Sequence, residues 1–151
     1  MRLHLIIYNI LIAFAAVILL GSCDKVPING PLDGMWQLTS VQTPAGSRDA
    51  LADRAYLSIQ LHISEWECGG KRYYSAFNKD NDSICFERFL HHSLHRTSAD
   101  DNDAVTKEEL AAGAFDVWEI HTESARFRIN RLDGSHLELQ RADTIITFRK
   151  F

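Results

Sequence analysis

The chain has 151 residues, of which 46% are hydrophobic, and a formal net charge of −4. This size suits a single domain with one hydrophobic core. The acidic balance disfavours nucleic acid as a partner, because a surface that binds nucleic acid must be basic to neutralise the phosphates.

A hydrophobic run at residues 5–20 follows a short basic start. It is shorter than the roughly 20 apolar residues of a membrane span, and its order of basic, apolar and small residues is typical of a secretory signal peptide. The run ends in Leu-Gly-Ser-Cys at residues 20–23, which resembles the lipobox of bacterial lipoproteins. The resemblance implies that residues 1–22 are a cleaved signal peptide and that the Cys23 thiol carries a diacylglyceryl group. An uncleaved anchor or an ordinary signal peptide is the alternative.

A lipid on Cys23 places the protein at a membrane, because two or more acyl chains hold a protein stably on a bilayer. We therefore expect the membrane as a partner and a location in the bacterial cell envelope, at the outer membrane or cell surface in preference to the inner membrane. Residues 23–33 hold two of the three prolines of the chain, and this density of Pro and Gly predicts a tether. The folded domain is expected at residues 34–151.

Alternating apolar and polar residues predict strands along most of this domain. In LSIQLHIS, residues 57–64, every second residue is apolar, which is the pattern of a strand with one buried face. The last part of the chain, from residue 125, predicts a meander of three strands, with Asp133-Gly134 as a tight turn whose glycine accepts a positive φ. Four further strands are expected at residues 36–43, 71–78, 83–92 and 115–122.

One short helix is expected after Thr106, because Thr106 and Glu109 match a capping box and Gly113 suits the left-handed residue that ends a helix. Eight antiparallel strands with short turns favour an up-and-down barrel, since closure removes exposed sheet edges. A β-sandwich is the alternative architecture. Export from the cytoplasm permits a disulfide between Cys68 and Cys85, and two buried free thiols are the alternative, because connectivity cannot be deduced from sequence.

Two segments carry a resemblance to a known family. Gly34-Met35-Trp36 resembles the Gly-x-Trp start of the lipocalins, and residues 127–151 resemble the C-terminus of lipocalin-like lipoproteins from Bacteroidetes. The resemblance implies a barrel with one closed end, in which Trp36 is a structural plug and a basic side chain of the last strand stacks on it. Arg149 is the candidate, although alternation places it on the face opposite Ile146. The resemblance implies neither catalytic residues nor a cofactor.

Two functions from different classes follow from a barrel of this kind. In the first, the barrel binds a small apolar ligand between its inward residues, which are suited to line a pocket. These candidate residues, which would equally fill a solid core, are Leu57, Ile59, Leu61, Phe127, Ile129, Leu137 and Leu139. In the second, the barrel is filled and acts as a non-catalytic interaction module of the envelope. Its binding surface would then include Tyr73, Tyr74 or Trp118 and the loop at residues 93–105.

Neither a metal site nor an enzyme is expected. His91, His92 and His95 precede Asp100, Asp101 and Asp103, and imidazole and carboxylate groups are good ligands for transition metals. Neighbouring residues of a strand point to opposite faces, however, so this cluster is interpreted as a solvated strand end. Cys85 with His91 or His92 has no supporting nucleophile motif, so we expect no catalysis.

Overall fold

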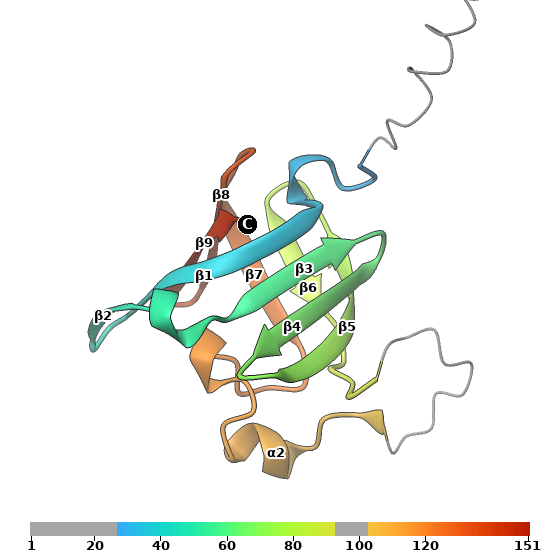
Figure 1. Ribbon diagram of the computed structural model, residues 1–151, viewed down its shortest axis with the longest axis vertical. Helices are drawn as coiled ribbons and strands as arrows, with labels where there is room; N and C mark the ends of the chain where they lie inside the picture. Colours follow the sequence, from blue (N-terminus) through green and yellow to red (C-terminus); the bar gives the residue numbers. More distant parts are fainter. Residues whose placement is uncertain (1–26, 93–102) are drawn as a thin grey trace, which may run out of the picture.

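A computed structural model describes residues 27–92 and 103–151, which form one nine-stranded antiparallel sheet, one short α-helix and three short 3-10 helices (Figure 1). The strands are β1 (Gly34–Thr43), β2 (Gly46–Asp49), β3 (Tyr56–Gln60), β4 (Ile63–Cys68), β5 (Lys71–Lys79), β6 (Ser83–Phe86), β7 (Ala125–Leu132), β8 (His136–Arg141) and β9 (Thr144–Lys150). The helices are α2 (Lys107–Ala111) and the 3-10 helices η1 (Gly30–Leu32), η2 (Leu51–Asp53) and η4 (Asp116–Trp118). Within the described ranges, no helix has the length and hydrophobicity needed to cross a bilayer.

The sheet closes on itself because β1 pairs on one edge with β9 and on the other with β3 and β2. Gly34–Gln37 pairs with β3, whereas residues 40–43 pair with β2. Eight strands, β1 and β3–β9, therefore form the closed barrel, and β2 is an added hairpin strand at its rim. The predicted eight-stranded up-and-down barrel is confirmed, and the alternative of two packed sheets does not apply.

The strand predicted at residues 57–64 is in fact a hairpin. Leu61 and His62 form the turn between β3 and β4, with Leu61 at φ 57° and 47% exposed. The inner face therefore continues from Ile59 to its partner Ser64, both of which are buried. The sequence alternates without interruption across a two-residue turn, so the pattern alone did not mark the end of β3.

Two other strand predictions need correction. Residues 115–122 form η4 and a turn instead of a strand, with Glu119 at φ 56° ending η4. Within the predicted strand at residues 83–92, β6 ends at Phe86, and only an isolated bridge at Leu90 continues the pairing. The sequence analysis also missed β2, whose four residues are all exposed and so carry no hydrophobic alternation.

The C-terminal meander is confirmed as β7, β8 and β9. The predicted reason for its first turn is wrong, because Gly134 does not adopt a positive φ. The Asp133 carboxylate instead shapes the turn by accepting hydrogen bonds from the backbone N–H groups of Ser135 and His136, each at 2.8 Å. These bonds, and first among them the one from Ser135, lower the pKa of Asp133 well below its usual range. An Asx-type turn of this kind makes the positive φ unnecessary.

The predicted helix is confirmed as α2. The Thr106 hydroxyl accepts a hydrogen bond from the Glu109 N–H at 3.2 Å, and the Glu109 carboxylate accepts one from the Thr106 N–H at 2.8 Å. Gly113 follows the helix at φ +91°. This left-handed backbone conformation favours glycine, which has no Cβ, at position 113.

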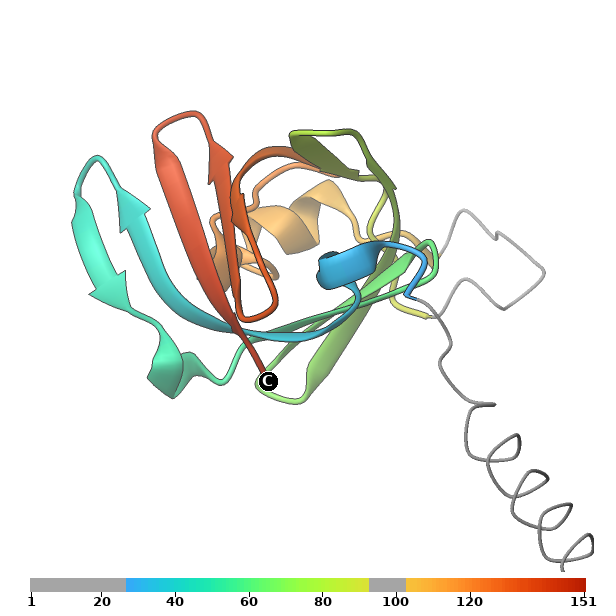
Figure 2. The ribbon, with the colours of Figure 1, turned by 90° about the horizontal axis from the view of Figure 1, so that it is seen from above.

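One end of the barrel is closed by η1 and by the start of β1, as the view from above shows (Figure 2). Trp36 is fully buried and its Nε1 donates to the Leu32 carbonyl at 2.8 Å. The Lys150 Nζ lies 4.2 Å from the Trp36 ring centroid and donates to the Pro31 carbonyl at 2.8 Å. Trp36 is therefore the buried plug of this end, with a cation stacked on its ring.

The stacked cation is Lys150 and not Arg149. Arg149 points to the outer face and donates to the Gln37 side-chain oxygen at 2.7 and 3.0 Å. The segment just before β1, which was predicted as part of a tether, also differs. This segment packs on the barrel, as the full burial of Leu32 at the end of η1 shows.

The β3–β4 hairpin generates a matched prediction about stability. Leu57→Ala removes a fully buried side chain and should reduce the free energy of unfolding by about 2–5 kcal/mol. Leu61→Ala removes an exposed side chain and should change it by less than about 0.5 kcal/mol. Urea denaturation followed by circular dichroism measures both. If both variants lost the same free energy of unfolding, residues 57–64 would instead form a single continuous strand.

Candidate functional site

The end of the barrel opposite η1 is covered by a separate segment rather than by the strands themselves. This segment, residues 103–121, which we name the lid, contains α2 and η4 and lies between β6 and β7 in the chain. Figure 1 shows α2 below the lower ends of β4 and β5, with η1 at the other end of the molecule. The lid therefore decides what can enter this mouth of the barrel.

Aromatic contacts bind the lid to the barrel core. Trp118 packs edge-on against Trp66 with ring centroids 5.3 Å apart, and both are fully buried. Phe115 lies 4.4 Å from Phe89 and 4.7 Å from Tyr73, measured between ring centroids. Pairs of this kind are each worth about 0.5–1.5 kcal/mol beyond the area that they bury. The lid thus fills the mouth with aromatic side chains.

One polar atom in this cluster has no partner. Among the buried side-chain nitrogen and oxygen atoms of residues 27–92 and 103–151, only the Trp118 Nε1 lacks a hydrogen bond. A buried donor without an acceptor costs about 1–3 kcal/mol, and such a group calls for a specific explanation.

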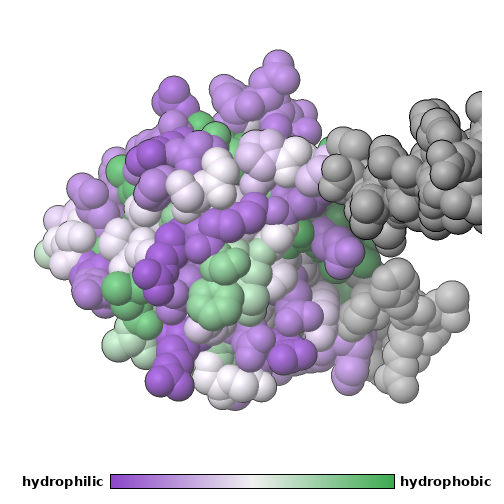
Figure 3. All heavy atoms as spheres, turned by 45° about the horizontal axis from the view of Figure 1, so that its top comes forward, coloured by the Kyte–Doolittle hydropathy of each residue, from purple (hydrophilic) through white to green (hydrophobic). Residues whose placement is uncertain are grey.

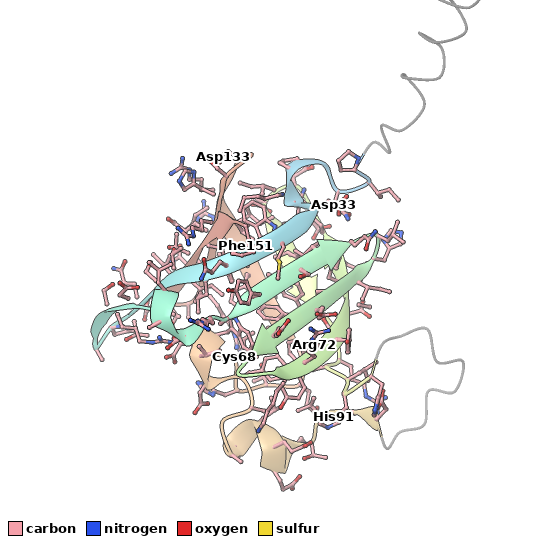
Figure 4. The ribbon with its side chains drawn as sticks, viewed as in Figure 1. Asp33, Cys68, Arg72, His91, Asp133 and Phe151 are labelled. Carbon is pink, nitrogen blue, oxygen red and sulfur yellow. The ribbon has the colours of Figure 1, made fainter. Side chains whose placement is uncertain are left out.

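A pocket of about 290 Å³ lies between the lid and the β4–β5 hairpin. We name it the mouth pocket. It is lined by Cys68, Lys71, Tyr73, Glu109, Ala112, Gly113, Ala114 and Val117. Figure 4 places Cys68 at the lower end of the barrel and His91 below it and to the right. The lining combines apolar side chains of the lid with a cation, a carboxylate, a phenol and a thiol.

Glu109 connects the lid to the barrel electrostatically. Its carboxylate accepts hydrogen bonds from the Thr106 N–H and hydroxyl, and it lies 3.2 Å from the His91 Nε2. The Thr106 N–H, then its hydroxyl and His91, lower the pKa of Glu109. Burial and the nearby Glu109 charge raise the pKa of Tyr73, so this phenol stays protonated at neutral pH.

The one thiol of the mouth pocket is held in its protonated form. Burial and the Asp53 charge raise the pKa of the Cys68 thiol, and this thiol donates to the Asp53 carbonyl at 3.7 Å. A thiol is a nucleophile only as the thiolate, which a raised pKa suppresses. Cys68 therefore contributes a weak donor and apolar surface to the pocket.

Most of the residues predicted to line an internal pocket belong to the hydrophobic core. Leu57, Ile59, Phe127, Leu137 and Leu139 are at most 1% exposed, and Ile129 packs partly buried against them. Leu61 is the exception, since it lies exposed in the β3–β4 turn and is not an inner wall. The mouth pocket is lined by none of these seven residues. The sequence analysis thus located the core correctly but not a cavity within it.

The predicted surface aromatics are also mostly internal. Trp118 is fully buried and Tyr73 is 8% exposed, whereas Tyr74 is half-buried on the outer face of β5. Residues 93–102 of the predicted binding loop, with His95, Asp100 and Asp101, lie outside the described residues, as does Cys23. At the described end of that loop, Val105 is buried.

The predicted disulfide is wrong, because Cys68 and Cys85 are free thiols. Strand β5 separates β4 from β6, and the partners of the two cysteines on β5 are Lys71 and Asn78. Positions so far apart along one strand lie about 23 Å from each other, against a limit of about 7 Å between bridged Cα atoms.

The histidines pair individually with carboxylates. His91 contacts Glu109, and His92 contacts Asp103, a contact that lowers the pKa of Asp103. In the part of the chain that the structure describes, no three His, Cys, Asp or Glu residues gather as metal ligands. The sequence signal that came nearest to the site was the capping box at Thr106 and Glu109, because it marks the start of the lid.

The described chain is thus a closed eight-stranded up-and-down β-barrel, with one end plugged by Trp36 and the other covered by a lid. The model of the lipocalin-like domain family matches residues 18–151, and the chain belongs to this family.

Solved structures share the fold. A lipocalin-like protein from Bacteroides uniformis ATCC 8492 is 20% identical, with a TM-score of 0.58 over 81% of this chain and 100% of that one. An uncharacterized protein from Bacteroides eggerthii DSM 20697 is 18% identical, with a TM-score of 0.58 over 80% of this chain and 99% of that one. A protein from Burkholderia xenovorans is 13% identical, with a TM-score of 0.50 over 79% and 82%. No curated protein matches the chain.

Glu109 generates a prediction about pH. A carboxyl whose pKa is lowered by folding stabilises the lid above its unfolded pKa of about 4.3, and this stabilisation is lost as the pH falls through the folded pKa. Hydrogen-exchange protection of the Leu110 and Ala112 amides, corrected for intrinsic rates, should therefore decrease below about pH 4. Glu109→Gln should lower the protection at neutral pH and flatten its pH dependence. The exposed Glu108→Gln is the control, and an equal effect there would refute the role of Glu109.

Proposed function

We propose that this protein is a lipid-anchored binding protein of the bacterial cell envelope that takes a small amphipathic molecule at the barrel mouth. The observation that carries the proposal is the mouth pocket, in which polar groups from β4, β5 and α2 converge beside apolar lid residues. Ligand sites are mostly apolar, with a few placed polar groups that orient the ligand.

The size of the pocket restricts the ligand. Its volume of about 290 Å³ is at the low end for binding sites, which span about 300–1,000 Å³. The apolar part of the ligand would lie against Ala114 and Val117, and its polar end would face Lys71, Tyr73 and Glu109. A larger ligand requires movement of the lid, which would also offer the Trp118 N–H an acceptor.

Membership of the lipocalin-like family supports a binding role, since the fold has a mouth at one end. The filled interior favours one alternative, a non-catalytic module that acts through its outer surface on a protein partner. In that case the mouth pocket would stay empty in the cell.

The ligand prediction is tested with two neighbouring alanines, Ala111 at the end of α2 and Ala112 directly after it. Ala112 lines the mouth pocket and Ala111 does not, and both side chains are exposed. We expect native mass spectrometry of the wild-type protein, purified gently from its own envelope extract, to show an added mass that organic solvent removes. Ala112→Trp should lose this mass because the indole fills the pocket, and Ala111→Trp should keep it. A bare wild-type protein would favour the surface-acting module.

The lipid anchor is tested at Cys23, within the sequence that resembles a lipobox. Cys23→Ala should release the protein from the membrane fraction, because the acyl chains that hold it are then not attached. Cys68→Ala is the control and should remain bound. Sedimentation of the Cys23→Ala variant with membranes after a carbonate wash would refute lipidation.

A further inference from the structure

Two large hydrophobic side chains are exposed together at the closed end of the barrel. Ile28 is 63% exposed and Leu61 is 47% exposed. With Pro27 and Ile59 they border one groove of about 620 Å³ beside the start of β1. We name these four residues the entry patch. Figure 3 shows hydrophobic residues gathered at this side of the molecule, next to the place where the described chain begins.

Hydrogen bonds hold the chain segment at Ile28 next to the β3–β4 turn that carries Leu61. The Asn29 Nδ2 donates to the Leu61 carbonyl at 2.7 Å and to the Asp33 carboxylate at 2.5 Å. The Asn29 N–H also donates to the Asp33 carboxylate, at 3.1 Å. The chain entry is thus clamped to the β3–β4 turn, so Ile28 and Leu61 are presented side by side rather than independently.

The fold gives no reason for a leucine at position 61. Its backbone has φ 57°, a left-handed conformation that glycine adopts without penalty and that costs other residues about 1 kcal/mol or more. Its side chain is also exposed, so it adds little to the core. A residue that is unfavourable for both backbone and solvation points to a role outside the folded domain.

The length of the chain before the entry patch indicates what covers it. Four residues separate Cys23 from Ile28, and the five Cα-to-Cα steps between them span at most about 18 Å in a fully extended chain. The lid lies at the opposite end of a barrel whose first strand alone has ten residues, about 33 Å in length. With lipid on Cys23, the closed end therefore lies nearer to the bilayer than the lid does.

We propose that the entry patch docks on the phospholipid bilayer, with Ile28 and Leu61 in the boundary between headgroups and acyl chains. The proposal rests on the lipid anchor of the proposed function and adds a second, orienting contact to it. Asp33 borders the groove and the chain is acidic, so the contact depends on apolar burial and not on attraction to anionic headgroups. The mouth pocket then faces away from the membrane, and its ligand arrives from the aqueous phase.

The experiment places a tryptophan in the entry patch of the full, lipidated protein. The three native tryptophans are fully buried, so the wild-type signal can be subtracted. Leu61→Trp is reconstituted in vesicles of phosphatidylethanolamine and phosphatidylglycerol whose acyl chains carry bromine near the headgroup, which quenches nearby indoles. Ala111→Trp, exposed on α2 at the far end, is the matched control. We expect Leu61→Trp to be quenched at least about twofold more than the control, with little change between low and high salt.

Vesicle flotation separates the failure of docking from the failure of the anchor. If the wild-type protein does not float with the vesicles, the lipid anchor fails and the docking that depends on it is overturned. If the protein floats but both variants are quenched equally, docking alone is overturned. If the Leu61→Trp emission shifts to the blue without lipid as the protein concentration rises, the patch binds a second copy of the chain, which also overturns docking on the bilayer.

A second variant excludes loss of folding as an explanation. Leu61→Gly removes the apolar side chain and at the same time relieves the positive φ, so its stability to urea should equal or exceed that of the wild type. The docking contact should be lost, so an Ile28→Trp reporter should be quenched less in the Leu61→Gly background than with Leu61 present. Unchanged quenching would overturn the role of Leu61.

Discussion

The pairing of β1 with β9 is the constraint on which the rest of the structure depends, because it joins the first barrel strand to the last. Once these strands pair, every barrel strand has a neighbour on both edges. Trp36 lies at this seam, opposite Lys150, and is buried beneath it. Gly34 leaves room for the Lys150 side chain, since a Cβ at position 34 would lie 2.8 Å from it.

Closure leaves the barrel with two ends, and the ends differ in chemistry. At the closed end, the plug and η1 leave an apolar groove beside Ile28 and Leu61. At the mouth, the lid leaves a pocket with charged and polar groups. We infer that one protein uses the first end for the membrane and the second for a small ligand, so neither interaction obstructs the other.

Between these ends the interior is packed with aromatic side chains. Trp66 contacts Phe86, Phe89, Phe115 and Trp118 with ring centroids 4.8–6.2 Å apart. A core of this density resists a guest molecule, because a guest must replace existing contacts. In the function that we propose, movement of the lid is therefore the route by which the binding volume would grow.

Local patterns in the sequence determined much of the fold. Strict alternation located most inward residues, the capping box located α2, and Gly34-Met35-Trp36 located the start of the barrel. Alternation records only which side chains are buried, and for this reason it did not distinguish the β3–β4 turn from a continuous strand. For the same reason the pattern did not distinguish the lid at Phe115 and Trp118 from a strand, since buried aromatic residues occur both in strands and in 3-10 turns.

The tertiary structure alone decided the rest, because the remaining features depend on residues distant in the sequence. The separation of Cys68 from Cys85 follows from β5 lying between their strands. The mouth pocket joins Lys71 and Tyr73 to a helix more than thirty residues further along the chain. The β1–β9 register decides that Lys150, and not Arg149, stacks on the Trp36 ring. Such distances are set by pairing and packing across the whole barrel, which no local pattern encodes.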